Sequence, residues 1–124
     1  MLYLWIALFG LVGIFARFGL QALLQQPGGT GFPWGTLLVN VTGSLLVGFI
    51  ARAGTGVSGI SPELRIGLMV GLCGGYTTFS GYSLEIVRML QEGAWLRGTV
   101  YAASSVLVSL AATALGMQAA AKIL

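Results

Sequence analysis

The chain has 124 residues, of which 56% are hydrophobic and only 7% are charged, and its formal net charge is +3. Since a soluble domain carries about 25% charged residues, this composition predicts an all-α integral membrane protein with one domain over residues 1–124. An inventory of three acidic residues, one Cys and no His argues against an enzyme, because it offers neither a metal cluster nor a nucleophile–base pair. The few, dispersed charges also argue against a nucleic-acid-binding surface.

Four apolar segments are expected to cross the membrane as helices, at about residues 2–24, 34–51, 64–90 and 98–121. Each is adequate or slightly long for the roughly 20 residues that cross the hydrocarbon core. Trp5, Trp34 and Trp95 lie at span entrances, where amphipathic rings favour the membrane interface. The linkers are short, and they are polar or rich in Gly and Pro.

The first two spans each carry a polar residue that has two interpretations. Arg17 follows Gly13 by one turn and precedes Gln21 by another. It either extends its charged end to the interface or stands at a vestibule that attracts anions. Asn40 lies in the second span between Thr36 and Ser44, and it either joins helices or lines a pathway.

The stretch Gly74-Gly75-Tyr76-Thr77-Thr78-Phe79-Ser80-Gly81 lies within the third span. Gly costs about 1 kcal/mol relative to Ala inside a helix, so the third helix is predicted to be broken between Gly74 and Gly81. Hydrocarbon tolerates a break only where the freed backbone faces protein or a water-filled cavity, which makes an ion site the first hypothesis. The alternative is a close helix contact through a GxxxG ridge of Gly67, Gly71 and Gly75. That ridge explains the glycines but not the Thr-Thr-Phe-Ser.

Two more polar features follow. Glu85 precedes Arg88 by three residues, which indicates either an i,i+3 ion pair or a carboxylate on a pathway. The fourth span carries hydroxyls at a strict four-residue spacing, on one helix face: Tyr101, Ser105, Ser109 and Thr113. Single hydroxyls often bond back to their own helix, but four in register indicate a polar track.

The positive charges are balanced across the membrane. With four spans, three side chains fall on each side: Arg52, Arg65 and Lys122 near the side of the N-terminus, and Arg17, Arg88 and Arg97 toward the other. Orientation normally follows an excess of Lys and Arg in short loops. The even split therefore predicts insertion in both orientations and permits an antiparallel dimer; the alternative is a single orientation set by other features.

The polar chemistry of the spans suits a small anion. The first, second and fourth spans contain no acidic residue, whereas a cation pathway would use carboxylates or converging carbonyls. Hydroxyls, an amide and aromatic ring edges instead offer hydrogen-bond donors and partial positive charge.

These motifs resemble those of the Fluc (CrcB) family of fluoride channels. The matching residues are Gly13 with Arg17, the string Trp34-Gly35-Thr36-Leu37-Leu38-Val39-Asn40 with Gly43, and Gly74-Gly75-Tyr76-Thr77-Thr78-Phe79-Ser80, with Glu85 at the family's distance. The resemblance covers the whole chain. The GGxTTFS string in a broken third span is highly specific, whereas GxxxR alone is weak.

The resemblance implies an antiparallel dual-topology homodimer in a bacterial-type inner membrane, with two fluoride pores and a structural sodium ion at its centre. Backbone carbonyls of Gly74 and Thr77 would bind the sodium ion. The implied fluoride pathway comprises an amide donor, aromatic rings and hydroxyls: Asn40, Phe79, Tyr82, Ser80, Ser83, Tyr101, Ser105 and Ser109. Arg17 and Glu85 would serve the vestibule or the structure.

Two residues depart from the family's pattern. Tyr82 stands where the family usually has a second Phe, and Gly81 replaces a Thr. A phenol keeps the ring edge of the usual Phe but adds a hydroxyl.

The expected function is passive export of fluoride through a channel. The alternative is a small dual-topology drug/proton antiporter of four spans, which matches the size and charge balance equally well. Such an antiporter requires a carboxylate in its first span, and this first span has none. A structural membrane protein without transport activity is a third class, and neither rival explains the Gly74–Gly81 stretch.

Overall fold

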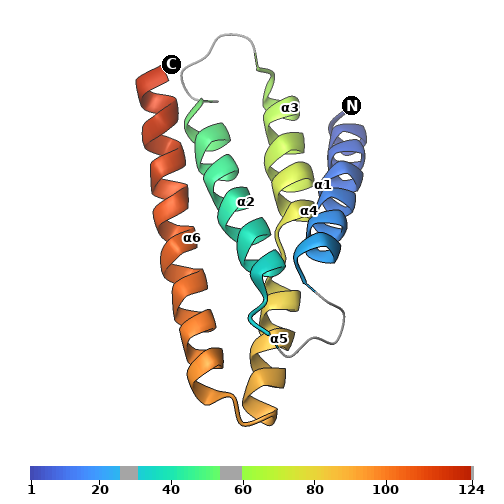
Figure 1. Cartoon of the computed structure of the whole chain (residues 1–124). Coiled ribbons are helices and arrows are strands. Elements are labelled where there is room, and N and C mark those ends of the chain that lie inside the picture. Colours follow the sequence, from blue (N-terminus) through green and yellow to red (C-terminus); the bar gives the residue numbers. More distant parts are fainter. Residues whose placement is uncertain (26–30, 54–59, 124) are drawn as a thin grey trace.

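The computed structural model describes residues 1–25, 31–53 and 60–123, and they are almost entirely helical with no strand among them. The elements, in chain order, are α1 (Leu2–Leu24), α2 (Trp34–Ala53), α3 (Pro62–Ile66), the π-helix η1 (Gly67–Cys73), α4 (Gly74–Tyr76), α5 (Phe79–Gln91) and α6 (Trp95–Ile123). Both termini lie at the same end of the bundle (Figure 1). The predicted all-helical membrane protein is confirmed.

Three continuous helices are long and apolar enough to cross a membrane, namely α1, α2 and α6. The third predicted span is divided into α3, η1, α4 and α5, which follow one another along the bundle (Figure 1). The first helix has the predicted bounds, whereas α2, the third span and α6 extend beyond theirs. Helix α3 begins at Pro62, which suits the first helical position because the N–H it lacks would have no helical acceptor there. The Ser61 side chain caps this helix by accepting from the Leu64 N–H at 3.1 Å.

The turn between α5 and α6 explains the early start of the last helix. Gly93 has φ 79°, a left-handed conformation that favours glycine after a helix end. The N–H of Ala94 then donates to the Met89 carbonyl at 2.8 Å, and the Gly93 N–H to the Leu90 carbonyl at 3.1 Å. These bonds satisfy the last carbonyls of α5 and let α6 begin at Trp95.

The bundle is built from two close helix pairs. α2 packs along α6, and α1 packs along η1 and α4. In the first pair, a Cβ added to Gly48 would strike the Thr113 carbonyl, and one added to Gly116 would strike the Leu45 carbonyl. Only residues without a side chain allow these backbones to touch.

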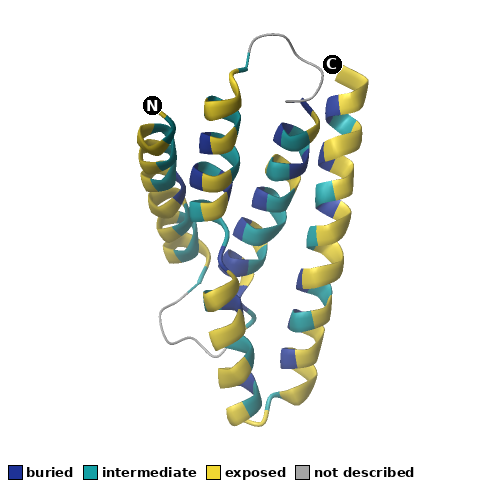
Figure 2. Ribbon diagram, turned by 180° about the vertical axis from the view of Figure 1, so that it is seen from behind, coloured by how far each residue is buried: buried dark blue, intermediate teal, exposed yellow. Residues whose placement is uncertain are grey.

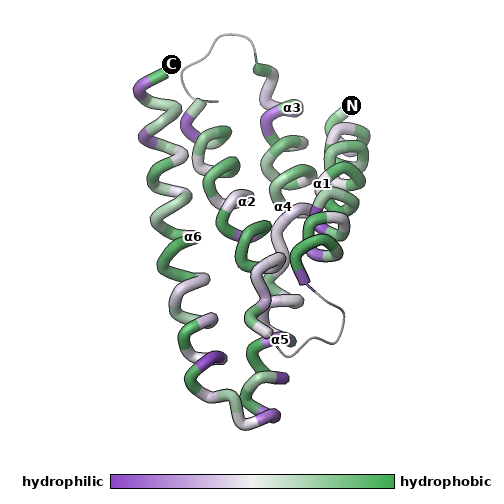
Figure 3. The backbone as a smooth tube through the Cα atoms, viewed as in Figure 1, coloured by the Kyte–Doolittle hydropathy of each residue, from purple (hydrophilic) through white to green (hydrophobic). Residues whose placement is uncertain are grey.

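The outer surface of the chain is apolar. Exposed and intermediate residues cover the outward side of α1 and α6 (Figure 2), and Leu11, Phe15 and Phe18 on α1 are each more than half exposed. Hydrophilic colour gathers mainly near the helix ends (Figure 3). Together with the hydropathy of α1, α2 and α6, this pattern is that of a multi-pass protein whose outer face meets lipid.

Candidate functional site at the interrupted third span

The third span is broken at Thr77 and Thr78 alone. Both residues are extended, with φ −87° and ψ 158° at Thr77 and φ −147° and ψ 113° at Thr78. The predicted break over Gly74–Gly81 is therefore too wide, because Gly74 keeps right-handed helical angles and α5 begins at Phe79. The Thr78 hydroxyl accepts from the Gly81 N–H at 3.0 Å and so caps α5 directly after the break.

Contact with α1 explains three of the glycines before the break. A Cβ on Gly67 would lie 2.7 Å from Cβ of Trp5, and one on Gly75 would lie 2.8 Å from the Gly10 carbonyl. Gly71 packs equally closely against the Ile6 carbonyl. The ridge interpretation thus holds for these three glycines. Gly74 is different, since a Cβ there would meet no atom nearer than 3.8 Å.

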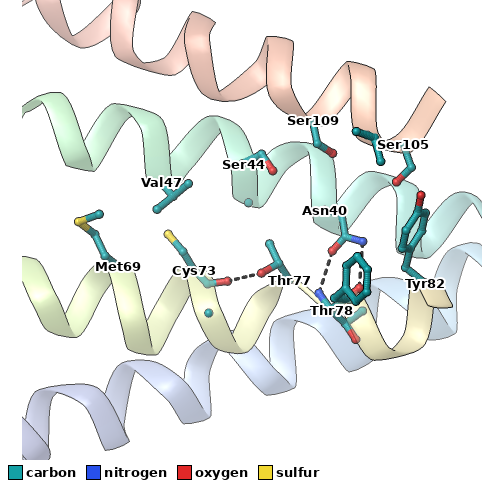
Figure 4. A pocket seen from close by; sticks show the side chains of 14 residues that line it. Asn40, Ser44, Val47, Met69, Cys73, Thr77, Thr78, Tyr82, Ser105 and Ser109 are labelled. Carbon is teal, nitrogen blue, oxygen red and sulfur yellow. Dashed lines mark hydrogen bonds between the residues drawn. The ribbon is translucent and has the colours of Figure 1, made fainter. Parts of the chain in front are cut away.

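Neighbouring helices hold the broken segment in place. Asn40 binds both backbone groups of Thr78: its Nδ2 donates to the carbonyl at 3.1 Å and its Oδ1 accepts from the N–H at 2.8 Å. From α1, Arg17 Nε donates to the Gly75 carbonyl at 3.0 Å. The Tyr76 and Thr42 hydroxyls are 2.9 Å apart, which adds a further link to α2. The Asn40–Thr78 pair is drawn with dashed lines in Figure 4.

Two carbonyls lose their helical donors at the break. In a continuous helix the Thr78 N–H would bond the Gly74 carbonyl, but it donates to Asn40 instead. The Gly81 N–H, which would bond the Thr77 carbonyl, donates to the Thr78 hydroxyl. The Cys73 carbonyl, by contrast, accepts from both the N–H and the hydroxyl of Thr77, at 3.0 and 2.9 Å.

A cavity of about 370 Å³ opens beside the break, between α2, the third span and α6 (Figure 4). Its lining includes seven residues predicted for the ion site or the pathway, and it also takes in apolar side chains such as Val47 and Met69. The predicted residues are Asn40, Gly74, Thr77, Phe79, Tyr82, Ser105 and Ser109, together with the unpredicted Thr78 and Ser44. The break and the polar face of α6 therefore share one cavity.

Aromatic rings line one end of this cavity and continue behind it. The Phe79 and Tyr82 ring centroids are 5.5 Å apart, and Tyr82 meets Tyr101 at 5.3 Å in an edge contact. The Tyr82 hydroxyl donates to the Ala102 carbonyl at 2.7 Å, so it binds α6. Tyr82 and Tyr101 are buried, whereas Phe79 is 77% exposed on the single chain. Tyr101 lies behind the cavity lining, in contact with Tyr82 and Phe32.

The predicted hydroxyls fall into two groups. Ser105 and Ser109 line the cavity, and the buried Ser109 Oγ has no hydrogen-bond partner within the described residues. Thr113, the next residue in the register, bonds back to the Ser109 carbonyl at 3.1 Å. Ser80 and Ser83 are exposed on α5 outside the cavity lining, and the Ser80 hydroxyl lies 3.3 Å from that of Thr78. The structure thus groups Ser105 and Ser109 with the break but leaves Ser80 and Ser83 outside.

Glu85 belongs to a cluster that joins three helices. Its Oε1 accepts from the Thr36 hydroxyl at 2.6 Å, and its Oε2 accepts from Gln25 Nε2 at 3.4 Å. No direct ion pair between Glu85 and Arg88 occurs among the described residues, and the Glu85 carboxylate bonds Thr36 and Gln25 instead. Thr36 belongs to the Trp34–Asn40 string but is not among the predicted site residues, and Gln25 belongs to no motif at all. Thr78 could have been recognised as a helix cap that precedes the apolar start of α5.

Three continuous helices and one interrupted span around a cavity that takes in an amide and several hydroxyls define a small multi-pass membrane protein of the transport class. The family model described as CrcB-like protein, Camphor Resistance (CrcB), matches residues 4–117. The chain belongs to this CrcB-like family.

Curated relatives share most of the chain's length. A protein of Geobacter metallireducens named "Fluoride-specific ion channel FluC" is 46% identical over 93% of both chains. A protein of the same name from Rhizobium meliloti is 43% identical over 87% of this chain and 86% of its own. Another, from Sorangium cellulosum, is 39% identical over 98% of this chain and 96% of its own. The similarity therefore spans all the helices that form the cavity.

Proposed function

We propose that this chain is a fluoride-selective passive channel that exports fluoride across the cell membrane. Its relatives carry that name over nearly their whole length, and the observation that carries the proposal here is the cavity beside the interrupted span. Fluoride must lose a costly hydration shell inside a pore, so the pore has to supply hydrogen-bond donors in its place.

The cavity supplies donors of suitable strength. Ser105 and Ser109 present hydroxyls, and the Asn40 amide keeps one N–H beyond the bond to Thr78, because an amide has two. The edges of the Phe79 and Tyr82 rings add partial positive charge. The pathway would continue past Tyr101 and, outside the cavity lining, past Ser80 and Ser83. Several weak donors allow the ion to leave as well as to enter.

A second copy of the chain, in the opposite orientation, would complete the channel. Phe79 is 77% exposed and the cavity opens beside it, so a single chain leaves its own pathway residues uncovered. An antiparallel homodimer with a two-fold axis in the membrane plane would cover them and would give two pores. The three-to-three division of basic residues supports dual topology.

A sodium ion would sit on that axis as a structural cofactor. The carbonyls of Gly74 and Thr77 fit this role, because their helical donors are bound elsewhere and both residues line the open cavity. An all-carbonyl set without carboxylates suits a monovalent hard cation. The ion would satisfy the broken helix and join the two subunits.

The drug/proton antiporter is the weaker alternative. It needs a titrating carboxylate in the first span, and the first acidic residue of this sequence is Glu63. Fluoride and chloride electrodes can decide between the two by following efflux from liposomes that contain the purified protein. Fast fluoride release without chloride release is expected, and proton-driven substrate uptake without fluoride release would refute the channel.

A further inference from the structure

The end of α1 reaches the cluster that holds Glu85. Gln25 is the C-terminal cap of α1, with its own N–H donating to the Gln21 carbonyl at 2.8 Å. Its side-chain Oε1 accepts from the Thr36 N–H and lies 2.9 Å from the Thr36 hydroxyl oxygen. Its Nε2 donates to Glu85 at 3.4 Å. One amide therefore links α1, α2 and α5.

This amide satisfies groups that would otherwise be costly. Thr36 is fully buried in the first turn of α2, where backbone N–H groups have no helical acceptor. Gln25 supplies that acceptor from another helix. The close approach of the end of α1 to the start of α2 requires Gly35, since a Cβ there would lie 2.8 Å from Gln25 Oε1 and 2.9 Å from Gln21 Cα.

The Thr36 hydroxyl has one proton and two acceptors near it. Glu85 Oε1 is 2.6 Å away, a distance typical of a charge-assisted bond, and Gln25 Oε1 is 2.9 Å away. Gln21 Nε2 donates to the same hydroxyl at 3.0 Å and so occupies a lone pair. The amide oxygen of Gln25 accepts from the Thr36 N–H, so the amide group that faces the Glu85 carboxylate is the Gln25 NH2, a donor. The donor directions in the cluster are thus fixed.

The cluster lies one helical turn beyond the cavity lining, and its three residues Gln25, Thr36 and Glu85 are not part of that lining. Glu85 lies three residues after Tyr82, and therefore on the same face of α5. Tyr82 lines the cavity, and a carboxylate one turn away would repel a passing anion. An N–H that faces this carboxylate offsets part of its charge and restricts its rotation.

We propose that Gln25 is a positioning residue of the conduction pathway, which fixes Glu85 against Thr36 through its side-chain amide. The proposal rests on the fluoride channel function. Gln25 does not touch the ion in this scheme. It acts through Glu85, by holding the carboxylate against Thr36.

The small number of acidic residues makes a direct test possible. The chain has three acidic residues, and Glu63 and Glu92 are both exposed. In a Glu63→Gln/Glu92→Gln background, Glu85 is the one remaining side-chain carboxylate, so its infrared stretching band can be followed. Gln25→Met, which keeps a similar length but has no amide, should shift that band. It should also lower fluoride release about tenfold, the loss expected for one hydrogen bond to a charged group.

Two further variants separate positioning from folding. Gln25→Glu keeps an acceptor for the Thr36 N–H but removes the donor to Glu85, so it should fold and yet release fluoride slowly. Gln118→Leu, an exposed amide on α6, should change neither band nor rate. An unshifted band in Gln25→Met, or a wild-type rate in Gln25→Glu, would overturn the role of Gln25. Absence of fluoride release from the unaltered protein would instead overturn the channel function itself.

Discussion

Asn40 and Thr78 form a two-bond pair in which a side-chain amide replaces the helical partners of a backbone unit. Nδ2 donates to the Thr78 carbonyl at 3.1 Å and Oδ1 accepts from its N–H at 2.8 Å. Thr78 is buried, so both groups would be costly without these bonds. The break in the third span is therefore stabilised from α2, and one side chain both holds the break and lines the cavity.

Asn40→Leu should destabilise the protein, because it leaves both backbone groups of Thr78 unpaired. The expected cost is about 1–3 kcal/mol for each buried group that loses its partner. Thermal unfolding of the purified protein in detergent measures it. Ser44→Ala, one turn along α2 and also in the cavity lining, is the matched control and should unfold close to the wild-type temperature. Equal unfolding of Asn40→Leu and wild type would show that the pair does not stabilise the break.

Phe79→Ile should reduce fluoride release while leaving the assembly intact. Ile keeps bulk and apolarity but lacks the electropositive ring edge. A fall of at least about tenfold is expected, which corresponds to about 1.4 kcal/mol in the barrier. The measurement is liposome efflux, with size-exclusion chromatography to confirm an unchanged oligomer. Phe18→Ile is the control, since Phe18 is comparably exposed on α1, at 70%, but lies away from the cavity. Normal conduction by Phe79→Ile would eliminate the ring edge from the pathway.

Tyr82→Phe should conduct fluoride at about the wild-type rate. The hydroxyl donates to the Ala102 carbonyl and not into the cavity, so its loss leaves the ring between Phe79 and Tyr101. The variant should lose about 1 kcal/mol of stability, the usual net value of one hydrogen bond. Efflux and thermal unfolding, measured together, separate the two effects. A strong loss of conduction with unchanged stability would place the hydroxyl in the pathway.

The helices and the position of the break could be predicted from the sequence, because hydropathy and glycine content act locally. The width of the break could not. Gly74 and Gly75 are poor helix formers, yet both are helical in α4, where Gly75 packs closely against the Gly10 carbonyl of α1. That contact depends on how α1 packs, which lies outside any local propensity.

The candidate site shows the same limit. The spacing of Ser105 and Ser109 on α6 placed both correctly on one face, and both line the cavity. The partners of Glu85 could not be predicted, since Gln25 and Thr36 are 60 and 49 residues away in sequence and the string that contains Thr36 does not point to Glu85. An ion pair with Arg88 was one of two interpretations of Glu85, because spacing along a helix reveals only partners that are near in sequence.

Dual topology predicts labelling from both sides of the membrane. The linker between α2 and α3 lies partly outside the described residues, but Glu63 is described and exposed at the start of α3. In a Cys73→Ala background, Glu63→Cys should react with an impermeant maleimide that is added outside right-side-out vesicles and also when it is added outside inverted vesicles. Reaction from one face only would remove the basis for an antiparallel dimer. Several Lys added between residues 54 and 59 should impose one orientation and abolish fluoride release when that variant is expressed alone.

The last prediction concerns Gly74 and the proposed sodium ion. A Cβ on Gly74 meets no atom of its own chain nearer than 3.8 Å, so Gly74→Val should leave the isolated subunit undisturbed. A strong defect would therefore indicate a contact outside the subunit, at the partner or the ion. We expect Gly74→Val to abolish fluoride release and to weaken dimerisation. Gly19→Val on α1, where a Cβ also meets nothing within 4 Å, should affect neither.

Side-chain substitutions at Thr77 should have little effect on fluoride release, because the proposed ligand of the sodium ion is its backbone carbonyl. Thr77→Ser keeps the hydroxyl that donates to the Cys73 carbonyl at 2.9 Å, and should conduct normally. Replacement of sodium by a large organic cation should stop fluoride release from the unaltered protein, and sodium should restore it, since the carbonyls of Gly74 and Thr77 have no helical donors. Full activity after exhaustive sodium removal would rule the ion out. If the Gly74→Val protein conducts at the wild-type rate, the subunits do not meet at the break in the third span.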